Sequence, residues 1–216
     1  MLLDYLIYFL LVSVILLLSK LIRIYIRGSL YLDALRLLLF FSPFLITIFF
    51  YGNPNFSMGN NYLVGFIIAI GASSIALLAQ YKDFSPYFHK NFYHIVPLHK
   101  KRIMISMEIS LLLSPLFEEL LYRYYFPNNH LIVDSILSSL LFSAVHYLNR
   151  LSKSTLKFKD YAILFALGMS WYLSFSVSGS ITPAIIGHLI YNLPNALISY
   201  LRYRIPNNPK TIQEEM

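Results

Sequence analysis

Long apolar runs separated by short polar connections dominate this chain. A helix needs roughly 20 apolar residues to cross the hydrocarbon core of a bilayer. Seven stretches approach or reach that length: about Tyr5–Ile22, Ala34–Tyr51, Tyr62–Gln80, Ile103–Phe126, His130–Leu148, Tyr161–Val177 and Ile181–Leu201. The pattern predicts an all-α fold, a polytopic transmembrane helical bundle of about seven spans.

Composition supports a membrane protein. Of the 216 residues, 57% are hydrophobic and 12% are charged, with a mean hydropathy of +0.61; soluble domains carry roughly 25% charged residues. We divide the chain into an N-terminal transmembrane scaffold with three spans and a basic cytosolic connection (1–102), a four-span core (103–201) and a polar cytosolic tail (202–216). Cysteine is absent, so thiolate nucleophiles, thiolate metal sites and disulfides are excluded.

The net charge of +7 could suggest nucleic acid, but the basic residues gather at alternate connections between the spans. They are Lys20, Arg23, Arg27 and Arg36, then Lys82, Lys90, Lys100, Lys101 and Arg102, then Arg150, Lys153, Lys157 and Lys159, and finally Arg202, Arg204 and Lys210. By the positive-inside rule, the N-terminus lies outside and the C-terminus in the cytosol. We therefore expect an integral protein of a bacterial plasma membrane, in contact with membrane lipid and without nucleic acid.

Ionisable residues interrupt the apolar stretch Ile103–Phe126. Glu118, Glu119 and Arg123 lie within it, and such groups are costly in hydrocarbon, so they usually mark function. Adjacent carboxylates on a helix point about 100° apart. Glu119 has Arg123 at i+4, the favourable order for a helical ion pair. Glu118 is then the free carboxylate, suited to take a proton from water as a general base.

Two further pairs lie in later spans, each at a spacing of four that puts both members on one helix face. In the pair Phe142 and His146, the imidazole could orient a water or deliver a proton to a leaving amine. Phe142 could serve packing alone or fix that imidazole. In the pair His188 and Asn192, both side chains can donate hydrogen bonds to the oxyanion of a tetrahedral intermediate. Together these residues could line one buried site.

Several other residues have simpler interpretations. Pro115, Pro183 and Pro194 lie close to the polar residues, where they could mark a hydrated pocket or only kink helices for packing. Trp171 is interpreted as an interfacial anchor or lipid-facing bulk. Asp134, at the start of a span, is expected to be solvated or to cap its helix.

The three motifs, Pro115-Leu-Phe-Glu-Glu-Leu-Leu-Tyr-Arg123, Phe142-Ser-Ala-Val-His146 and His188-Leu-Ile-Tyr-Asn192, resemble those of the CPBP (Abi-like) intramembrane proteases. This group contains CAAX prenyl proteases, including the Ras-converting endopeptidase, and bacteriocin-processing enzymes. The resemblance covers roughly residues 110–196. It implies a glutamate-dependent endopeptidase in an all-helical bundle, with Glu118 and His146 activating water and His188 and Asn192 forming the oxyanion site.

The resemblance leaves open whether the site holds a metal ion, and two features of this chain differ from what the family pattern leads us to expect. We expect no cofactor; the alternative is a zinc ion on Glu118, His146 and His188, although the His-Glu-x-x-His spacing is missing. Family members commonly have Arg-Gly where this chain has Arg123-Tyr124, so the helix is expected to continue past the arginine. The span boundaries also place His146 deeper than Glu118 by about 10 Å, at 1.5 Å per residue.

The expected function is hydrolysis of a peptide bond in a hydrophobic or membrane-associated peptide, in processing of a bacteriocin or pheromone or in self-immunity. A non-enzymatic alternative is a membrane regulator or immunity protein that binds a partner through the same cavity. A proton-coupled or metal-ion transporter would also explain intramembrane Glu and His. It predicts inverted repeats and paired broken helices, and the sequence shows neither.

Overall fold

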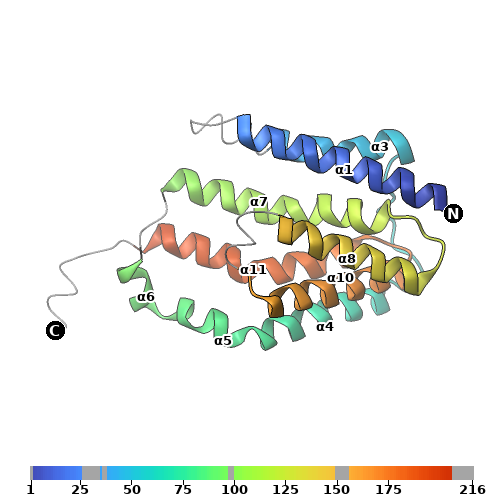
Figure 1. Ribbon diagram of the computed structural model, residues 1–216. Helices are drawn as coiled ribbons and strands as arrows, with labels where there is room; N and C mark the ends of the chain where they lie inside the picture. Colours follow the sequence, from blue (N-terminus) through green and yellow to red (C-terminus); the bar gives the residue numbers. More distant parts are fainter. Residues whose placement is uncertain (1, 26–34, 36–37, 97–99, 149–155, 206–216) are drawn as a thin grey trace, which may run out of the picture.

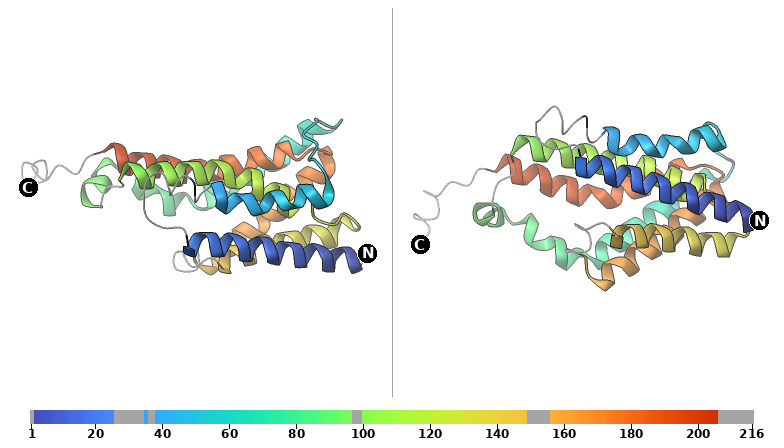
Figure 2. Two further views of the ribbon diagram at one scale, coloured as in Figure 1. Left: turned by 90° about the horizontal axis from the view of Figure 1, so that it is seen from above. Right: turned by 45° about the horizontal axis from the view of Figure 1, so that its top comes forward.

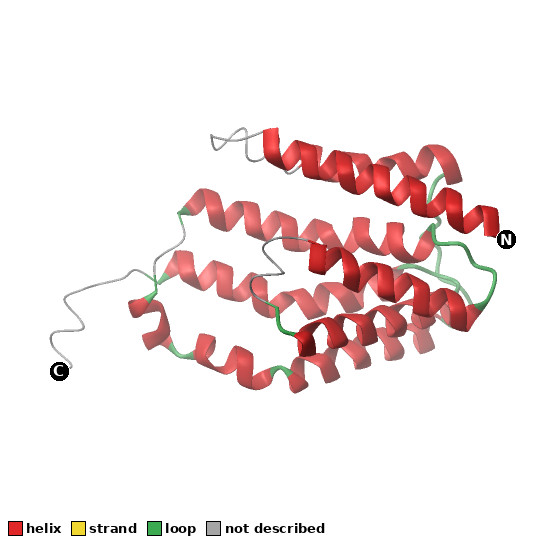
Figure 3. Ribbon diagram, viewed as in Figure 1, coloured by secondary structure: helices red, strands yellow, loops and turns green. Residues whose placement is uncertain are grey.

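The computed structural model describes residues 2–25, 35, 38–96, 100–148 and 156–205, and within these ranges every regular element is helical (Figures 1 and 3). The all-α prediction is confirmed. The elements are α1 (Leu2–Tyr25), the 3₁₀ turn η1 (Ser42–Leu45), α3 (Ile46–Tyr51), α4 (Tyr62–Ala79), α5 (Tyr81–Phe84), the 3₁₀ turn η2 (Ser85–Phe88), α6 (Lys90–Ile95), α7 (Lys101–Glu119), the π-helical turn η3 (Leu120–Tyr124), α8 (Leu131–Leu148), α10 (Phe158–Ser178) and α11 (Thr182–Arg204).

The long helices run roughly along one common axis (Figures 1 and 2). Helix α10 packs on α8 and α4, and α11 packs on α4 and α7. Helix α1 begins at the end of the bundle opposite to the one where α11 ends (Figure 2). The first and third motifs therefore lie on two helices in contact, α7 and α11, and the second lies on α8, which contacts the η3 turn that follows α7.

The seven-span count stays a prediction. Among the described helices, three are long and apolar enough to cross a membrane: Leu2–Ile22, Tyr62–Ala79 and Phe158–Ser178. Leu38–Tyr51 and Leu131–Tyr147 are apolar but shorter. Helices α7 and α11, where spans were also predicted, are 19 and 23 residues long, and both carry the ionisable motif residues, which lowers their apolarity.

Several residues used in the sequence predictions lie outside the described part of the chain. They are the basic residues Arg27, Arg36, Arg150, Lys153 and Lys210, and the part of the predicted tail beyond Ile205.

Small residues bring the central helices close together. The Ser174 hydroxyl donates to the Gly65 carbonyl at 2.8 Å, and a Cβ added at Gly65 would lie 2.6 Å from Ser178 Cβ. In a membrane, where lipid tails are as apolar as leucine, helix association depends on such close packing and hydroxyl bonds. The contact fixes α4 against α10, the helix that carries Trp171.

The three prolines have different positions in their helices. Pro115 and Pro194 lie inside α7 and α11, whereas Pro183 lies in the first turn of α11, where its missing N–H costs nothing. Pro183 is therefore a helix start, and the kink considered for it from the sequence is wrong. Asp134 acts as the expected cap: it accepts hydrogen bonds from the backbone N–H groups of Asn129 and His130, just before α8, and from the Tyr5 hydroxyl.

Candidate active site

The segment that carries the two glutamates ends in a π-helical turn. Helix α7 ends at Glu119, and the Tyr125 N–H donates to the Leu120 carbonyl, five residues back, at 3.0 Å. The helix thus continues past Arg123, as expected, but only to Tyr124. Such turns widen the helix, leave carbonyls to be satisfied from outside, and are frequent at functional sites.

Two hydroxyl groups from other helices bind the carbonyls of this turn. The Tyr8 hydroxyl of α1 donates to the Leu121 carbonyl at 2.6 Å, and the Ser138 hydroxyl of α8 donates to the Tyr122 carbonyl at 2.5 Å. Each pair is buried, so the bonds replace hydration that the carbonyls lose on folding. Helices α1 and α8 therefore set the orientation in which the turn presents Arg123.

Glu119 lies between a cation and a histidine. Its side chain is fully buried; Oε1 lies 2.8 Å from His188 Nδ1 and Oε2 lies 3.2 Å from Arg123 Nε. The expected ion pair is present, but its geometry is that of a charge contact rather than an aligned hydrogen bond. The Arg123 guanidinium also lies 4.4 Å from the centre of the Phe142 ring, so a ring face completes its buried surroundings.

Glu118 lies near Nε2, the other ring nitrogen of His188. Its Oε2 lies 3.9 Å from His188 Nε2, a separation too long for a hydrogen bond. That oxygen is buried and has no hydrogen-bond partner among the residues that the structure describes, while the side chain as a whole keeps 19% of its surface exposed. The two adjacent glutamates therefore have different tasks: Glu119 holds His188, and Glu118 keeps an uncommitted oxygen next to it.

The hydrogen bonds determine which nitrogen of each histidine carries a proton. The Phe142 carbonyl, 2.9 Å from His146 Nδ1, can only accept, so Nδ1 donates and Nε2 of the neutral ring keeps its lone pair. His188 Nδ1 donates in the same way to the Glu119 carboxylate. Its Nε2 is then an acceptor in the neutral ring and a donor only in the imidazolium.

Phe142 brings the two histidines into one cluster. Its buried ring meets His146 at 4.6 Å between centroids and 63°, and His188 at 5.7 Å and 87°. The ring both packs and fixes an imidazole, so the two uses considered for it coexist. The depth offset calculated for His146 does not separate it from this cluster, although the structure places it in contact with Phe142 rather than with Glu118.

Asn192 is occupied by the backbone of α7. Its Nδ2 donates to the Leu111 carbonyl at 3.1 Å, the carbonyl that Pro115, four residues later, leaves without a helical partner. One amide N–H is therefore committed to holding α11 against α7. The second N–H is the donor that remains for an oxyanion.

Trp171 belongs to this cluster, and the sequence interpretation missed it. The side chain is fully buried and stacks on His188, with centroids 4.3 Å apart and planes at 15°, so the prediction of a lipid-facing anchor is wrong. A signal was present: Gly168 and Ser174 lie three residues before and after it, on the same helix face. Small residues at that spacing mark a face packed against other helices.

The zinc alternative stays a prediction. Among the residues that the structure describes, no group of three or more His, Asp or Glu side chains is placed to hold a metal ion. The Phe142 carbonyl binds His146 Nδ1, which leaves the Nε2 lone pair available to a water or another ligand. We derive no chemistry through a metal.

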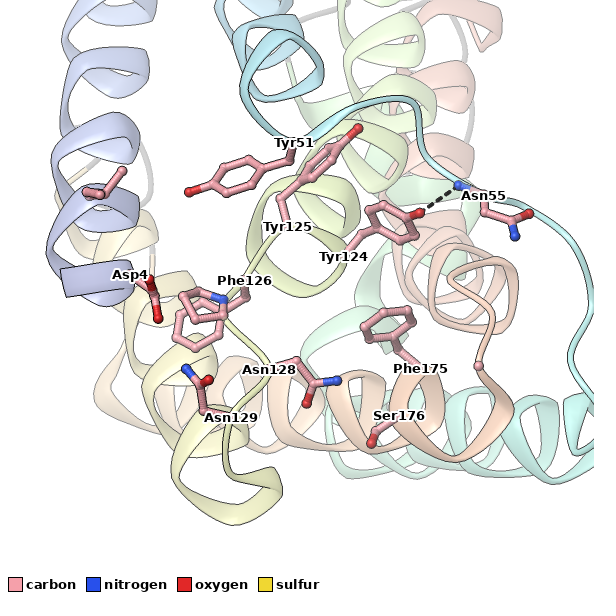
Figure 4. Close-up of a pocket in the computed structure, with 13 residues that line it drawn as sticks. Asp4, Tyr51, Asn55, Tyr124, Tyr125, Phe126, Asn128, Asn129, Phe175 and Ser176 are labelled. Carbon is pink, nitrogen blue, oxygen red and sulfur yellow. Dashed lines mark hydrogen bonds between the residues drawn. The ribbon is translucent and has the colours of Figure 1, made fainter. Parts of the chain in front are cut away.

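Two cavities between the described residues lie beside this cluster rather than in it. One, of about 680 Å³, opens at the end of η3, where Asn55 N–H donates to the Tyr124 hydroxyl at 2.8 Å and Phe175 and Asn128 face the space (Figure 4). The other, of about 850 Å³, lies between α8 and α10 and is mainly apolar. Neither is lined by the glutamates or histidines of the site.

Comparison with known proteins gives one match. Residues 101–194 match the model of the family described as "Type II CAAX prenyl endopeptidase Rce1-like". The matched segment runs from the start of α7 into α11, and it contains every motif residue of the cluster. No curated protein and no solved structure matches the chain.

Proposed function

From the membership of residues 101–194 in the Rce1-like family of type II CAAX prenyl endopeptidases, we propose that this chain is an intramembrane endopeptidase that uses Glu118 as its general base. One observation carries the proposal: two adjacent glutamates flank one imidazole, and only one of them is committed. Glu119 is bound to His188 and Arg123, while Glu118 Oε2 is buried and finds no hydrogen-bond partner in the described part of the chain. A buried carboxylate oxygen with no partner is costly, and a reacting water would supply one.

The proposed reaction begins with a water held between Glu118 and His146. Glu118 takes one proton from the water, while the lone pair on His146 Nε2 accepts the hydrogen bond from its other proton. The water oxygen bonds to the carbonyl carbon of the scissile peptide, and the C–O π electrons move to the carbonyl oxygen. When the C–N bond breaks, the proton held by Glu118 passes to the leaving amine nitrogen, which balances the hydrolysis.

The oxyanion would be stabilised from α11. The second amide N–H of Asn192 and the Nε2–H of protonated His188 are the available donors, and removal of one such donor typically costs about 10²–10³-fold in kcat. The Glu119 carboxylate supports the imidazolium by accepting the Nδ1–H bond. In this arrangement Arg123 and Glu119 are positioning residues.

The substrate that fits is a hydrophobic or membrane-associated peptide. The family description suggests a C-terminal Cys-aliphatic-aliphatic-X sequence with a prenylated cysteine. A small secreted peptide, such as a bacteriocin or pheromone precursor, is the alternative substrate, with a role in its processing or in self-immunity. We further propose a bacterial plasma membrane location with the N-terminus outside, on the strength of the alternating basic connections.

The test uses purified protein in detergent and two internally quenched peptides of the same sequence, one prenylated and one not. Wild type, Glu118→Gln and the matched control Glu108→Gln, another half-buried glutamate of α7, are compared with and without chelator. We expect cleavage by wild type and by Glu108→Gln, and loss by at least about 10³-fold in Glu118→Gln, comparable to losing a central catalytic group. Full activity in Glu118→Gln would refute its role as the base.

A second function has some structural support. Asn192 and Glu119 join α7 to α11, and Arg123 lies over the Phe142 ring of α8. Motifs kept for structure in a non-catalytic membrane regulator or immunity protein would make contacts of this kind. This alternative predicts no cleavage of either peptide and a cellular phenotype that survives Glu118→Gln.

A further inference from the structure

We infer that Trp171 is a positioning residue that fixes the plane of the His188 imidazole, and that Ser73 holds Trp171 in place. The inference rests on the proposed function for its effect on catalysis, but the contact itself does not. None of the three motifs contains Trp171 or Ser73. Both are fully buried and come from helices outside the motifs, α10 and α4.

The first step is the stacking geometry. The Trp171 and His188 rings are close to parallel, at 15°, with centroids 4.3 Å apart, whereas Phe142 meets the same imidazole edge-on at 87°. A ring face on one side and a ring edge on another restrict rotation about the last side-chain bond of His188. That rotation decides whether Nε2 points toward Glu118, because Nδ1 lies on the opposite side of the ring, against Glu119.

The second step is the support behind the indole. Trp171 Nε1 donates to the Ser73 hydroxyl at 3.2 Å. The Ser73 hydroxyl lies 2.7 Å from the carbonyl oxygen of Gly187, the residue immediately before His188, and 2.9 Å from that of Ala69. Ser73 therefore links the indole of α10 to the backbone of α11 at the position of the histidine. A buried indole N–H without this acceptor would be unsatisfied.

The third step is the space that allows the stack. A Cβ added at Gly187 would lie 2.9 Å from Trp171 Nε1 and 2.8 Å from Ala69 Cβ. Only a glycine lets α11 approach so closely. Three residues from three helices therefore hold the His188 imidazole in place: Ser73 of α4, Trp171 of α10 and Gly187 of α11.

The charged groups around His188 give its stacking on Trp171 an electrostatic role in addition to a positional one. Around His188 lie the carboxylates of Glu118 and Glu119 on α7, and the Arg123 guanidinium of η3 lies 5.7 Å from the Trp171 ring. In the proposed reaction the imidazolium must donate to an oxyanion, and an indole face attracts a cation stacked upon it. The Trp171 face would therefore stay in favourable contact with His188 while the imidazolium donates to the oxyanion.

The kinetic experiment compares Trp171→Leu, Trp171→Phe and Ser73→Ala with the matched control Tyr172→Phe, a neighbouring buried aromatic residue. Because a small displacement of a catalytic group can cost about 10²-fold, we expect kcat to fall roughly 10- to 100-fold in Trp171→Leu. Smaller losses are expected in Trp171→Phe and Ser73→Ala, KM should change little, and the control should match wild type. In a His188→Gln background, Trp171→Leu should add almost nothing, since the group it positions is gone.

The second readout does not need activity. Trp171 is the only tryptophan in the chain, so emission excited at a wavelength that indole absorbs and tyrosine does not reports on this ring alone. Contact with an imidazole, most strongly in its protonated form, quenches an excited indole. We expect His188→Gln to raise the emission, and the matched replacement His146→Gln to leave it nearly unchanged. Unchanged emission in His188→Gln, or additive losses of kcat in the double variant, would overturn the inference. If wild type cleaves neither peptide, the proposed function fails, and the emission alone decides whether Trp171 contacts and fixes His188.

Discussion

The Asn192 side chain replaces a backbone hydrogen bond that Pro115 removes. Its Nδ2 donates at 3.1 Å to the carbonyl of Leu111, the group that the N–H of residue 115 would have bound in an unbroken helix. Proline in the first motif and asparagine in the third are therefore parts of one contact between α7 and α11. The same amide is a proposed oxyanion donor, so structure and catalysis depend on one side chain.

This relationship predicts a separation of stability from activity. Asn192→Ala leaves the Leu111 carbonyl unsatisfied and should destabilise the protein by about 1–3 kcal/mol. In a Pro115→Ala background the restored N–H binds that carbonyl, so the further loss of stability from Asn192→Ala should be close to zero. Catalysis should still fall in the double variant, because the second amide N–H is absent.

Thermal unfolding in detergent and peptide cleavage, measured on the four proteins of this double-mutant cycle, check both parts. Equal destabilisation by Asn192→Ala in the two backgrounds would show that the amide does not serve the Leu111 carbonyl.

The buried ion pair predicts a large effect from a small change. Glu119→Gln removes the charge opposite Arg123, and both side chains are fully buried, so the uncompensated guanidinium should cost about 3–5 kcal/mol. The matched control is Asp83→Asn, which disrupts the exposed ion pair with Lys159, 2.6 Å long. No measurable shift in the apparent unfolding temperature is expected there, since exposed pairs contribute little. Similar unfolding temperatures for the two variants would contradict the role assigned to Glu119.

Two glycines should respond in opposite ways to the same substitution. Gly187→Ala places a methyl group 2.8 Å from Ala69 Cβ, and overpacking of this kind costs about 1–3 kcal/mol. Gly71→Ala adds a methyl group in α4 with nothing within 4 Å, so the higher helix propensity of alanine should stabilise by up to about 1 kcal/mol. Unfolding temperatures of both variants in one detergent test the close approach of α11 to α4.

The π-helical turn predicts a contrast between two buried tyrosines. Tyr8→Phe removes the hydroxyl that binds the Leu121 carbonyl, leaves that carbonyl unsatisfied and should cost about 1–3 kcal/mol. It should also lower kcat, because η3 carries Arg123. Within the described ranges the buried Tyr172 hydroxyl has no hydrogen-bond partner, so Tyr172→Phe should be neutral or stabilising. An equal loss of stability in Tyr172→Phe and Tyr8→Phe would contradict the role assigned to the hydrogen bond between Tyr8 of α1 and the Leu121 carbonyl.

The sequence by itself determined the helical class of the fold and the local pairs within the candidate site. In lipid, only an α-helix or a closed β-barrel satisfies all the backbone hydrogen bonds of a membrane-spanning segment. The long apolar runs Tyr62–Gln80 and Tyr161–Val177 could therefore be recognised as helices. Spacing of three and four residues fixes shared helix faces, so the Glu119 and Arg123 pair and the Phe142 and His146 pair also followed. These are local relationships, and local sequence contains them.

Only the tertiary structure decided which groups face each other across helices. Nothing local indicates that both glutamates lie beside the His188 ring or that Asn192 binds the Leu111 carbonyl. An apolar face in a membrane protein can contact lipid or protein at similar cost, because lipid tails are as apolar as leucine side chains. Hydrophobicity therefore does not decide whether such a face contacts lipid or protein. The tertiary structure decides it, through close packing at small residues such as Gly187.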